Sequence, residues 1–402
     1  MPGIVVPDTA IRVAKIELGV IMPDTLERPP RPRETIEDLL EVDSVRQFCV
    51  EISTDCNLAC VYCHVAPLAR RGSKASPELI EQIYDFVDRF PLGLVSISGE
   101  AEITLHKGWV DFAEGLLKRN ARLRIISNFS KGVFSEEEAD LLSRFREIVV
   151  SMDVADFELL KKTRYRADLR TMTLNIQNVR AAAIRNARPL PEFQVTIVVH
   201  DKSIMQIDKT TAFCAANGIK DVLAQLVLEE HEIPGGVNDF MKNPNAILVE
   251  PITKLSREQA IEASYACRRA TAIARLHGVK INMNEVLDVL ETIIDNSEVV
   301  DRATEDMEGR TRMCMMPWNF FYVQWDGATM PCCIIKDETL GSANESSLVD
   351  LINNSDRKAW RKGLLTGDMP DVCKTCTFVG SVPIDTFRAK VKDYLINGGT
   401  DL

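Results

Sequence analysis

The sequence predicts an α/β protein with a parallel sheet, either a closed or partial barrel or a doubly wound sheet, followed by a smaller C-terminal extension. Three observations lead to this fold class. Strand-like and helix-like segments alternate from residue 45 to residue 228, several strand-like runs are apolar throughout, and the composition changes near residue 313. Strands buried on both faces have unbroken apolar runs, and a regular alternation of strand and helix produces a parallel sheet.

Six strands are expected in the first part of the chain, and a helix or a loop follows each of them. The expected strands are 45–53, 92–98, 123–128, 147–153, 192–200 and 220–228. The expected helices have apolar side chains three and four residues apart and cover 76–90, 108–120, 135–145, 169–186 and 207–218. In parallel sheets, functional side chains lie just beyond the carboxyl ends of the strands, so we expect the site in the loops that follow them.

A second part of the chain begins near residue 251. A long helix is expected over 256–278, because Ser256 and Gln259 match a capping box and Gly278 matches a C-cap. Residues 313–335 have the pattern of a β-hairpin that turns at Asp326-Gly327, and a helix over 347–364 follows. The expected organisation is an N-terminal extension at 1–44, a barrel at 45–250, a helical connection at 251–312 and a C-terminal domain at 313–402.

The bulk composition is that of a globular protein, and it argues against several classes of function. Of 402 residues, 46% are hydrophobic and 27% are charged, and the net charge of −11 argues against a nucleic-acid or anionic-membrane partner. No apolar run is long enough to span a bilayer, and residues 1–20 lack the pattern of a secretory signal. We therefore expect a cytoplasmic protein, in which clustered cysteines are more often metal ligands than disulfides.

Three cysteines lie close together in the stretch CNLACVYCH, residues 56–64. Cys56, Cys60 and Cys63 follow the C-x3-C-x2-C spacing, directly after the first expected strand. Thiolate is the ligand of iron–sulfur clusters, whereas a structural zinc site needs a fourth local ligand. His64 is poorly placed to provide that ligand because it abuts Cys63. The loop therefore predicts an iron–sulfur cluster with one iron that no protein residue binds.

This loop resembles that of the radical SAM superfamily, and the resemblance covers roughly residues 45–230. It implies a partial (β/α)6 TIM-like barrel whose three cysteines bind a [4Fe–4S] cluster. It also implies that S-adenosylmethionine (SAM) binds the open iron and is cleaved to a 5′-deoxyadenosyl radical, which abstracts a hydrogen atom from a C–H bond. An external one-electron donor of the flavodoxin or ferredoxin type is the implied partner.

Further positions match the family strand by strand. Tyr62 matches the aromatic position near the adenine, and Ser98-Gly99-Glu100 resembles the glycine-glycine-glutamate motif, with Ser98 in place of its first glycine. The remaining matches are Ser127, Asn128, Ser151 and Asp153 at ribose-contacting positions, and Arg164 or Arg166 as the partner of the SAM carboxylate. Ser127, Asn128 and Asp153 could equally cap the helices that follow, and the arginines could be surface charges.

A second set of cysteines lies in the C-terminal part. Cys314 and Cys332 lie at the two ends of the expected hairpin, which would bring them together, and Cys373 and Cys376 form a C-x2-C pair. Four thiolates close a metal site, either as zinc or as a fully ligated iron–sulfur cluster. The set resembles the SPASM extension of radical SAM enzymes in its shorter twitch form, because no cysteine follows Cys376. This resemblance implies one auxiliary [4Fe–4S] cluster.

Several other residues could take part in chemistry on a substrate. Cys333 and Cys267 could return a hydrogen atom to a carbon radical, although a cysteine is more often a buried packing residue, as we expect for Cys49 and Cys214. The candidate bases are Glu102, Glu229, Glu230 and His231, of which the last three follow the sixth strand and could equally form a solvated acidic loop.

The resemblance to twitch-type enzymes favours a small-molecule substrate, namely a hydroxyl-bearing carbon of a carbohydrate, aminocyclitol or aminoglycoside, as in antibiotic biosynthesis. Dehydrogenation would give a ketone, and return of a hydrogen atom on the opposite face would give an epimer. The alternative is a peptide maturase, although the roughly fifty residues before the cysteine loop are too few for the peptide-recognition domain that many such enzymes carry. A third hypothesis, a non-catalytic metal scaffold, does not account for the open iron.

Overall fold

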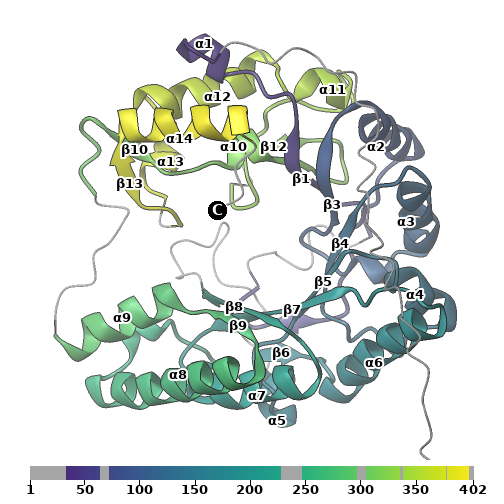
Figure 1. The fold of residues 1–402 in the computed structure, drawn as a ribbon, viewed down its shortest axis with the longest axis vertical. Helices are drawn as coiled ribbons and strands as arrows, with labels where there is room; N and C mark the ends of the chain where they lie inside the picture. The colour runs from purple at the N-terminus through teal and green to yellow at the C-terminus, as the bar shows by residue number, and fades with distance from the viewer. Residues whose placement is uncertain are drawn as a thin grey trace, which may run out of the picture. The chain divides into compact units, whose positions relative to one another are not determined.

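Six parallel strands form the centre of the fold, as the alternation in the sequence predicts (Figure 1). They lie in the order β1, β3, β4, β5, β7 and β8, and every neighbouring pair is parallel. Their bounds are β1 Val45–Val50, β3 Leu92–Ile97, β4 Leu123–Ser127, β5 Glu147–Ser151, β7 Glu192–Val199 and β8 Asp221–Leu226. All six expected strands and their parallel arrangement are therefore confirmed.

The computed structural model describes residues 33–63, 72–227, 247–296, 305–335, 338–376 and 378–397. All of these belong to the larger of the two units into which the chain divides, Arg33–Leu402. In these ranges, no helix is both long enough and apolar enough to cross a membrane.

Helices follow the strands and cover one face of the curved sheet (Figure 1). The expected ones are present as α2 Pro77–Arg89, α3 Trp109–Lys118, α4 Glu136–Leu142, α6 Leu169–Arg185 and α7 Ile207–Ala216. Ser76 caps α2, Ser135 caps α4, and Asp168 caps α6 by accepting from backbone amides of the first turn. Between β5 and β7, the structure adds a helix that we did not predict, α5 Phe157–Thr163, which is too short to give a clear apolar period.

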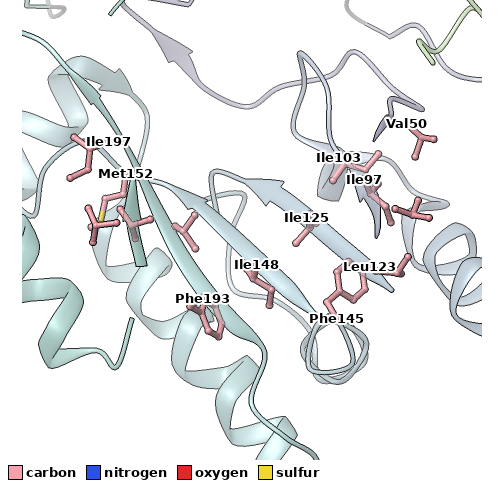
Figure 2. Close-up of a cluster of buried hydrophobic side chains, with 14 of the residues drawn as sticks. Val50, Ile97, Ile103, Leu123, Ile125, Phe145, Ile148, Met152, Phe193 and Ile197 are labelled. Carbon is pink, nitrogen blue, oxygen red and sulfur yellow. The ribbon is translucent and has the colours of Figure 1, made fainter. Parts of the chain in front are cut away.

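The strand register separates an apolar row from a polar row. Across five strands, the residues that pair side by side in the helix-facing row are Val50, Ile97, Ile125, Ile148 and Phe193. All five are buried, and Figure 2 shows them in the hydrophobic core. The neighbouring row, on the opposite face of the sheet, contains Cys49, Ser96, Arg124, Glu147 and Glu192. The polar face is therefore the one that remains for function.

Later segments extend the sheet at both ends. β9 (Lys280–Asn282) pairs parallel with β8, and β11 (Phe320–Val323) pairs parallel with β1. Before β9 in the chain, α8 (Arg257–His277) begins at the expected capping box and ends at Gly278, whose φ of 63° is left-handed, and α9 (Asn284–Ile294) follows β9. The C-terminal part thus continues the barrel sheet directly.

Two expectations for the C-terminal part need correction. The hairpin of β11 and β12 (Thr329–Met330) does turn through Asp326 and Gly327, but a helical turn, α10 (Met316–Asn319), separates Cys314 from it. The helix expected over 347–364 is wrong as a single element. It is two helices, α11 Leu348–Leu351 and α12 Ser355–Thr366, because Asn354 caps the second one. The remaining elements are α1 Ile36–Leu39, β10 Arg310–Arg312, α13 Asp371–Lys374, β13 Ser381–Pro383 and α14 Ile384–Asn397.

Candidate active site

The cysteine loop leaves the carboxyl end of β1, and a second short sheet fixes its middle. β2 (Ala59–Cys60) pairs antiparallel with β6 (Arg164–Tyr165), so that Cys60 lies directly opposite Arg164. Neither strand was predicted, because two residues are too few to show a period. This pairing attaches the loop to the segment that follows β5.

Side-chain amides hold the N-terminal end of the loop. Asn57, the residue after Cys56, donates from Nδ2 to the carbonyl of Ser130 at 3.0 Å and accepts from Asn128 Nδ2 at 2.9 Å. Asn128 and Ser130 belong to the turn after β4. The turn after β4 therefore positions Cys56, although β3 separates that strand from β1 in the sheet.

Glu102 is the buried centre of the same region. Its carboxylate accepts from Thr104 Oγ1 at 2.6 Å, from Ser127 Oγ at 2.8 Å and from the amide of Asn128 at 2.6 Å. Burial raises the pKa of this carboxyl, and the hydrogen bonds act against that rise. Glu102 and the Ser127 hydroxyl thus hold the backbone around the cysteine loop, and the ribose contacts expected of Ser127 and Asn128 stay predictions.

The three thiols of the loop are close enough to influence one another electrostatically. Burial raises the pKa of Cys56 to about 11 and that of Cys60 to about 12, and neighbouring thiols add to both shifts. Such thiols bind a metal as the metal displaces their protons. Among the described residues, no three His, Cys, Asp or Glu side chains already have the arrangement of a metal site. The donor set nevertheless fits an iron–sulfur cluster, because it consists of thiols alone.

A buried ion pair lies beside Cys60. Arg164 Nε is 3.1 Å from Asp153 Oδ1, and Arg164 Nη1 donates to Cys60 Sγ at 3.8 Å. The Tyr62 hydroxyl donates to the second oxygen of Asp153, and the Arg164 guanidinium lies 5.6 Å from the centre of the Tyr62 ring. The structure thus brings together Tyr62, Asp153 and Arg164, which were predicted to contact SAM. Their polar atoms contact one another.

The other two residues predicted after β5 lie apart from this ion pair. Arg166 is exposed, has a left-handed φ of 75° and places its guanidinium 5.5 Å from the ring centre of Tyr165. Ser151 is the half-buried last residue of β5. The structure assigns neither a ligand contact, so both stay predictions.

The Ser98-Gly99-Glu100 turn closes over a buried carboxylate that sequence reasoning missed. The amide of Glu100 donates to Glu51 Oε1 at 2.7 Å, and a Cβ placed on Gly99 would lie only 2.5 Å from the same oxygen. Residue 99 must therefore be glycine for Glu51 to remain where it is. The signal in the sequence was the position of Glu51 directly after an apolar strand. A glutamate is rarely buried unless another group pairs with it.

Ser98 connects this turn to β1, and Glu51 connects it to β11. The Ser98 hydroxyl lies 3.0 Å from Ser96 Oγ and 3.2 Å from Cys49 Sγ. The hydroxyl of Tyr322, on β11, donates to Glu51 Oε2 at 3.4 Å. A polar contact therefore runs from the turn after β3 to the C-terminal hairpin.

Four cysteines meet in the C-terminal part. Cys314 is influenced electrostatically by Cys332, Cys373 and Cys376, and burial raises the pKa of Cys314 and raises that of Cys373 to about 12. The amides of Ile334 and Ile335 donate to Cys332 Sγ, both at 3.4 Å. Two such donors favour a thiolate, which is the form that binds iron.

Arg312 holds the C-x2-C turn of this set and is a residue that the sequence analysis missed. It is 1% exposed, donates from Nε to the carbonyl of Lys374 at 3.2 Å, and pairs with Glu305 at 2.7 Å. Lys374 lies between the two cysteines of that turn. The only signal in the sequence was the position of Arg312, two residues before Cys314.

The remaining cysteines differ in their surroundings. Cys333 is exposed and directly follows Cys332. Cys267 is 0% exposed on α8, within the hydrophobic core, and burial raises its pKa to about 12. Cys49 and Cys214 are buried, as expected. Glu229, Glu230, His231 and His64 lie outside the described residues.

Two family models match the sequence. One, the radical SAM superfamily, matches residues 50–214 and includes the three-cysteine loop. The other, the SPASM iron–sulfur cluster-binding domain, matches residues 314–377 and includes all four C-terminal cysteines. No curated protein matches the chain in sequence.

Solved structures share the fold at low sequence identity. SuiB from Streptococcus suis, bound to its precursor peptide SuiA, is 14% identical with a TM-score of 0.58, over 85% of this chain and 73% of SuiB. The enzyme anSMEcpe with bound AdoMet is 16% identical with a TM-score of 0.55, over 88% of this chain and 98% of anSMEcpe. Its complex with AdoMet and the Kp18Cys peptide is 17% identical with a TM-score of 0.53, over 88% and 99% of the two chains. At these identities the likeness is one of fold.

Proposed function

The chain is a radical SAM enzyme with a C-terminal SPASM iron–sulfur domain, and from this premise we propose that it epimerises a hydroxyl-bearing carbon of a carbohydrate or aminocyclitol, with Cys333 as the hydrogen-atom donor. The bound cluster and SAM supply the 5′-deoxyadenosyl radical that removes the hydrogen atom. Cys56, Cys60 and Cys63 would hold that cluster, and Cys314, Cys332, Cys373 and Cys376 the auxiliary one. Tyr62 and the Ser98-Gly99-Glu100 turn would seat SAM.

The observation that carries the proposal is the position of Cys333. Its side chain is exposed, and it follows a cysteine of the C-terminal set directly. Burial raises the pKa of Tyr322, and Glu51, Cys49, Glu100 and Cys333 add to the rise, so these groups share one neighbourhood. Glu100 belongs to the turn proposed to seat SAM, and Glu51 accepts the amide of Glu100. These two observations support the proposal that the exposed Cys333 thiol returns a hydrogen atom to the substrate carbon.

The proposed reaction balances as follows. The substrate C–H bond breaks, and its hydrogen atom leaves as part of 5′-deoxyadenosine. The S–H bond of Cys333 then breaks as a new C–H bond forms on the opposite face, which leaves a sulfur radical. One electron from an external donor of the flavodoxin or ferredoxin class, with one proton from water, restores the thiol. The substrate is neither oxidised nor reduced, whereas SAM and electrons are consumed.

The experiment uses anaerobically reconstituted enzyme with SAM, dithionite and a panel of aminocyclitols and aminoglycosides in D₂O. Because a thiol exchanges its hydrogen with solvent, we expect an epimer with deuterium at the reacting carbon. Cys333→Ala should form 5′-deoxyadenosine but no epimer, and Cys214→Ala should form both. A ketone without deuterium would replace epimerisation by dehydrogenation, and an epimer from Cys333→Ala would exclude this donor. If no 5′-deoxyadenosine forms at all, the radical reaction itself is absent.

A peptide substrate is the second candidate. Two enzymes that share the fold, SuiB and anSMEcpe, have been solved with peptides bound. The proposed role of Cys333 does not depend on the substrate class, because an α-carbon radical of a residue would accept its hydrogen atom equally well. Short synthetic peptides tested beside the sugars distinguish the two, and deuterium incorporated into an amino-acid α-carbon would favour the peptide.

A further inference from the structure

We infer that Arg164, oriented by Asp153, is a positioning residue that holds Cys60 and raises the reduction potential of the metal centre of the cysteine loop. This inference rests on the proposal that Cys60 is a ligand of the SAM-binding cluster. It differs from the expectation that Arg164 pairs with the SAM carboxylate. Three contacts among Cys60, Arg164, Asp153 and Tyr62 support this role.

The first contact is between the guanidinium and the sulfur. Antiparallel pairing of β2 with β6 places Cys60 opposite Arg164, and Nη1 of the arginine donates to Sγ at 3.8 Å. The guanidinium thus places a positive charge beside this sulfur. A donor to a ligand sulfur and a positive charge beside it both stabilise the electron that a cluster gains on reduction.

The second contact fixes the arginine. Nε lies 3.1 Å from Asp153 Oδ1, an ion pair that is not aligned as a hydrogen bond, and the two side chains are only 9% and 0% exposed. The same Asp153 oxygen accepts the amide of Val198, on β7, at 3.2 Å. The carboxylate is thus tied to the neighbouring strand. A charge pair with so little water around it has few alternative positions, so the guanidinium stays on Cys60.

The third contact extends to Tyr62. Its hydroxyl donates to the other oxygen of Asp153, and its ring lies 5.6 Å from the guanidinium. Tyr62 directly precedes Cys63 in the chain. The Arg164–Asp153 ion pair therefore contacts the cysteine loop at two places, at Cys60 and at Tyr62. One buried carboxylate therefore orients both the arginine at the second cysteine of the loop and the aromatic ring before the third.

The test measures the reduction potential of the cluster whose electron paramagnetic resonance signal changes when SAM is added, in the anaerobically reconstituted full chain. Arg164→Gln should shift the potential to a more negative value, because it removes a donor and a positive charge. Asp153→Asn keeps an oxygen at the position that orients the arginine and removes only the negative charge, so it should shift the potential to a more positive value. Arg185→Gln is the matched control: the same change at an exposed arginine at the end of α6 should leave the potential unchanged.

Several outcomes would overturn the inference. Shifts of the same sign in Arg164→Gln and Asp153→Asn would indicate that either substitution simply disturbs the structure around the cluster. An unchanged potential in Arg164→Gln would show that the guanidinium does not raise the reduction potential. A weaker SAM affinity in Arg164→Gln at unchanged potential would assign the arginine to the SAM carboxylate instead. If Arg164→Gln keeps native circular dichroism but loses this cluster, Arg164→Lys and Arg185→Gln should retain its iron, and loss in all three would refute the role.

The failure of the proposed function is distinguishable from the failure of this inference. Absence of an epimer leaves the potentials measurable and the inference intact. If Cys60→Ala retains the SAM-responsive signal, Cys60 is not a ligand and the inference falls, whatever the reaction is.

Discussion

The two cysteine sets of this protein are assembled in opposite ways. Cys56, Cys60 and Cys63 belong to one loop, whereas the C-terminal four come from three separate segments. In the first set, neighbouring strands only orient cysteines that the chain has already brought together. In the second, tertiary contacts such as those of Arg312 with Lys374 create the proximity itself. A substitution near the one-loop set should therefore change the properties of its metal centre while its cysteines stay together. A substitution of a residue that holds the dispersed set together should separate its cysteines.

The largest effect is expected from a ligand of the first set. Cys60→Ala should reduce 5′-deoxyadenosine formation to the background rate while the iron of the C-terminal set remains, because the two sets share no residue. Cys214→Ala, a buried cysteine of α7, should cost about 1 kcal/mol of stability and no iron. Iron analysis and chromatography of the products measure both. Loss of all iron in Cys60→Ala would contradict the independence of the two sets.

The next effect concerns a support of the second set. Arg312→Gln removes a buried ion pair to Glu305 and the bond to the Lys374 carbonyl, so it should lower the free energy of unfolding by about 3–5 kcal/mol. It should also release iron from the C-terminal set while the SAM-responsive signal persists. Arg388→Gln, which breaks a more exposed pair with Asp385, should cost less than about 1 kcal/mol. Equal losses of stability and iron in the two variants would show that Arg312 does not support the C-terminal cysteines.

A smaller effect is expected at two glycines that differ in the space around them, Gly99 in the turn after β3 and Gly380 in the C-terminal part. Gly99→Ala places a methyl group 2.5 Å from Glu51 Oε1, whereas Gly380→Ala meets nothing within 4 Å. The first should cost about 1–3 kcal/mol and weaken SAM binding, because Glu51 must move. The second should stay within about 0.5 kcal/mol. Urea unfolding and SAM titration provide the measurements, and a neutral Gly99→Ala would mean that the turn adjusts freely.

The smallest effect concerns the contact that joins the two regions. Tyr322→Phe removes the hydroxyl that donates to Glu51 at 3.4 Å, so we expect a loss of about 0.5–1.5 kcal/mol. Tyr265→Phe, on an exposed tyrosine of α8, controls for the loss of a hydroxyl and should change nothing measurable. A Tyr322→Phe protein as stable as the unaltered one would show that this contact does not couple the two regions.

The sequence predicted what local patterns determine. Six strands, five helices between them, the capped helix α8 and the turn at Gly327 follow from apolar period, capping residues and turn chemistry. The prediction that the three-cysteine loop binds an iron–sulfur cluster follows from the spacing of its cysteines alone. The family matches agree with the resemblance read from that loop.

Long-range contacts lay beyond sequence reasoning, for physical reasons. The parallel pairing of β1 with β11 joins residues about 270 apart, and no periodicity encodes a partner at that distance. The β2–β6 pair is too short to show a pattern, although it decides that Arg164 faces Cys60. Glu51 and Arg312 are charged residues whose burial depends on partners that only the fold brings near.

The parallel pairing of β1 with β11 has a consequence for biosynthesis. On the ribosome, β1 emerges early, but Phe320–Val323, which cover its outer edge, follow only after most of the chain. During that interval, β1 is an unpaired edge strand that holds the buried residues Phe48 and Val50, and such edges associate with other chains. Until the hairpin is synthesised, we therefore expect the nascent barrel to be prone to association, and a ribosome that stalls before residue 320 to release an aggregation-prone fragment.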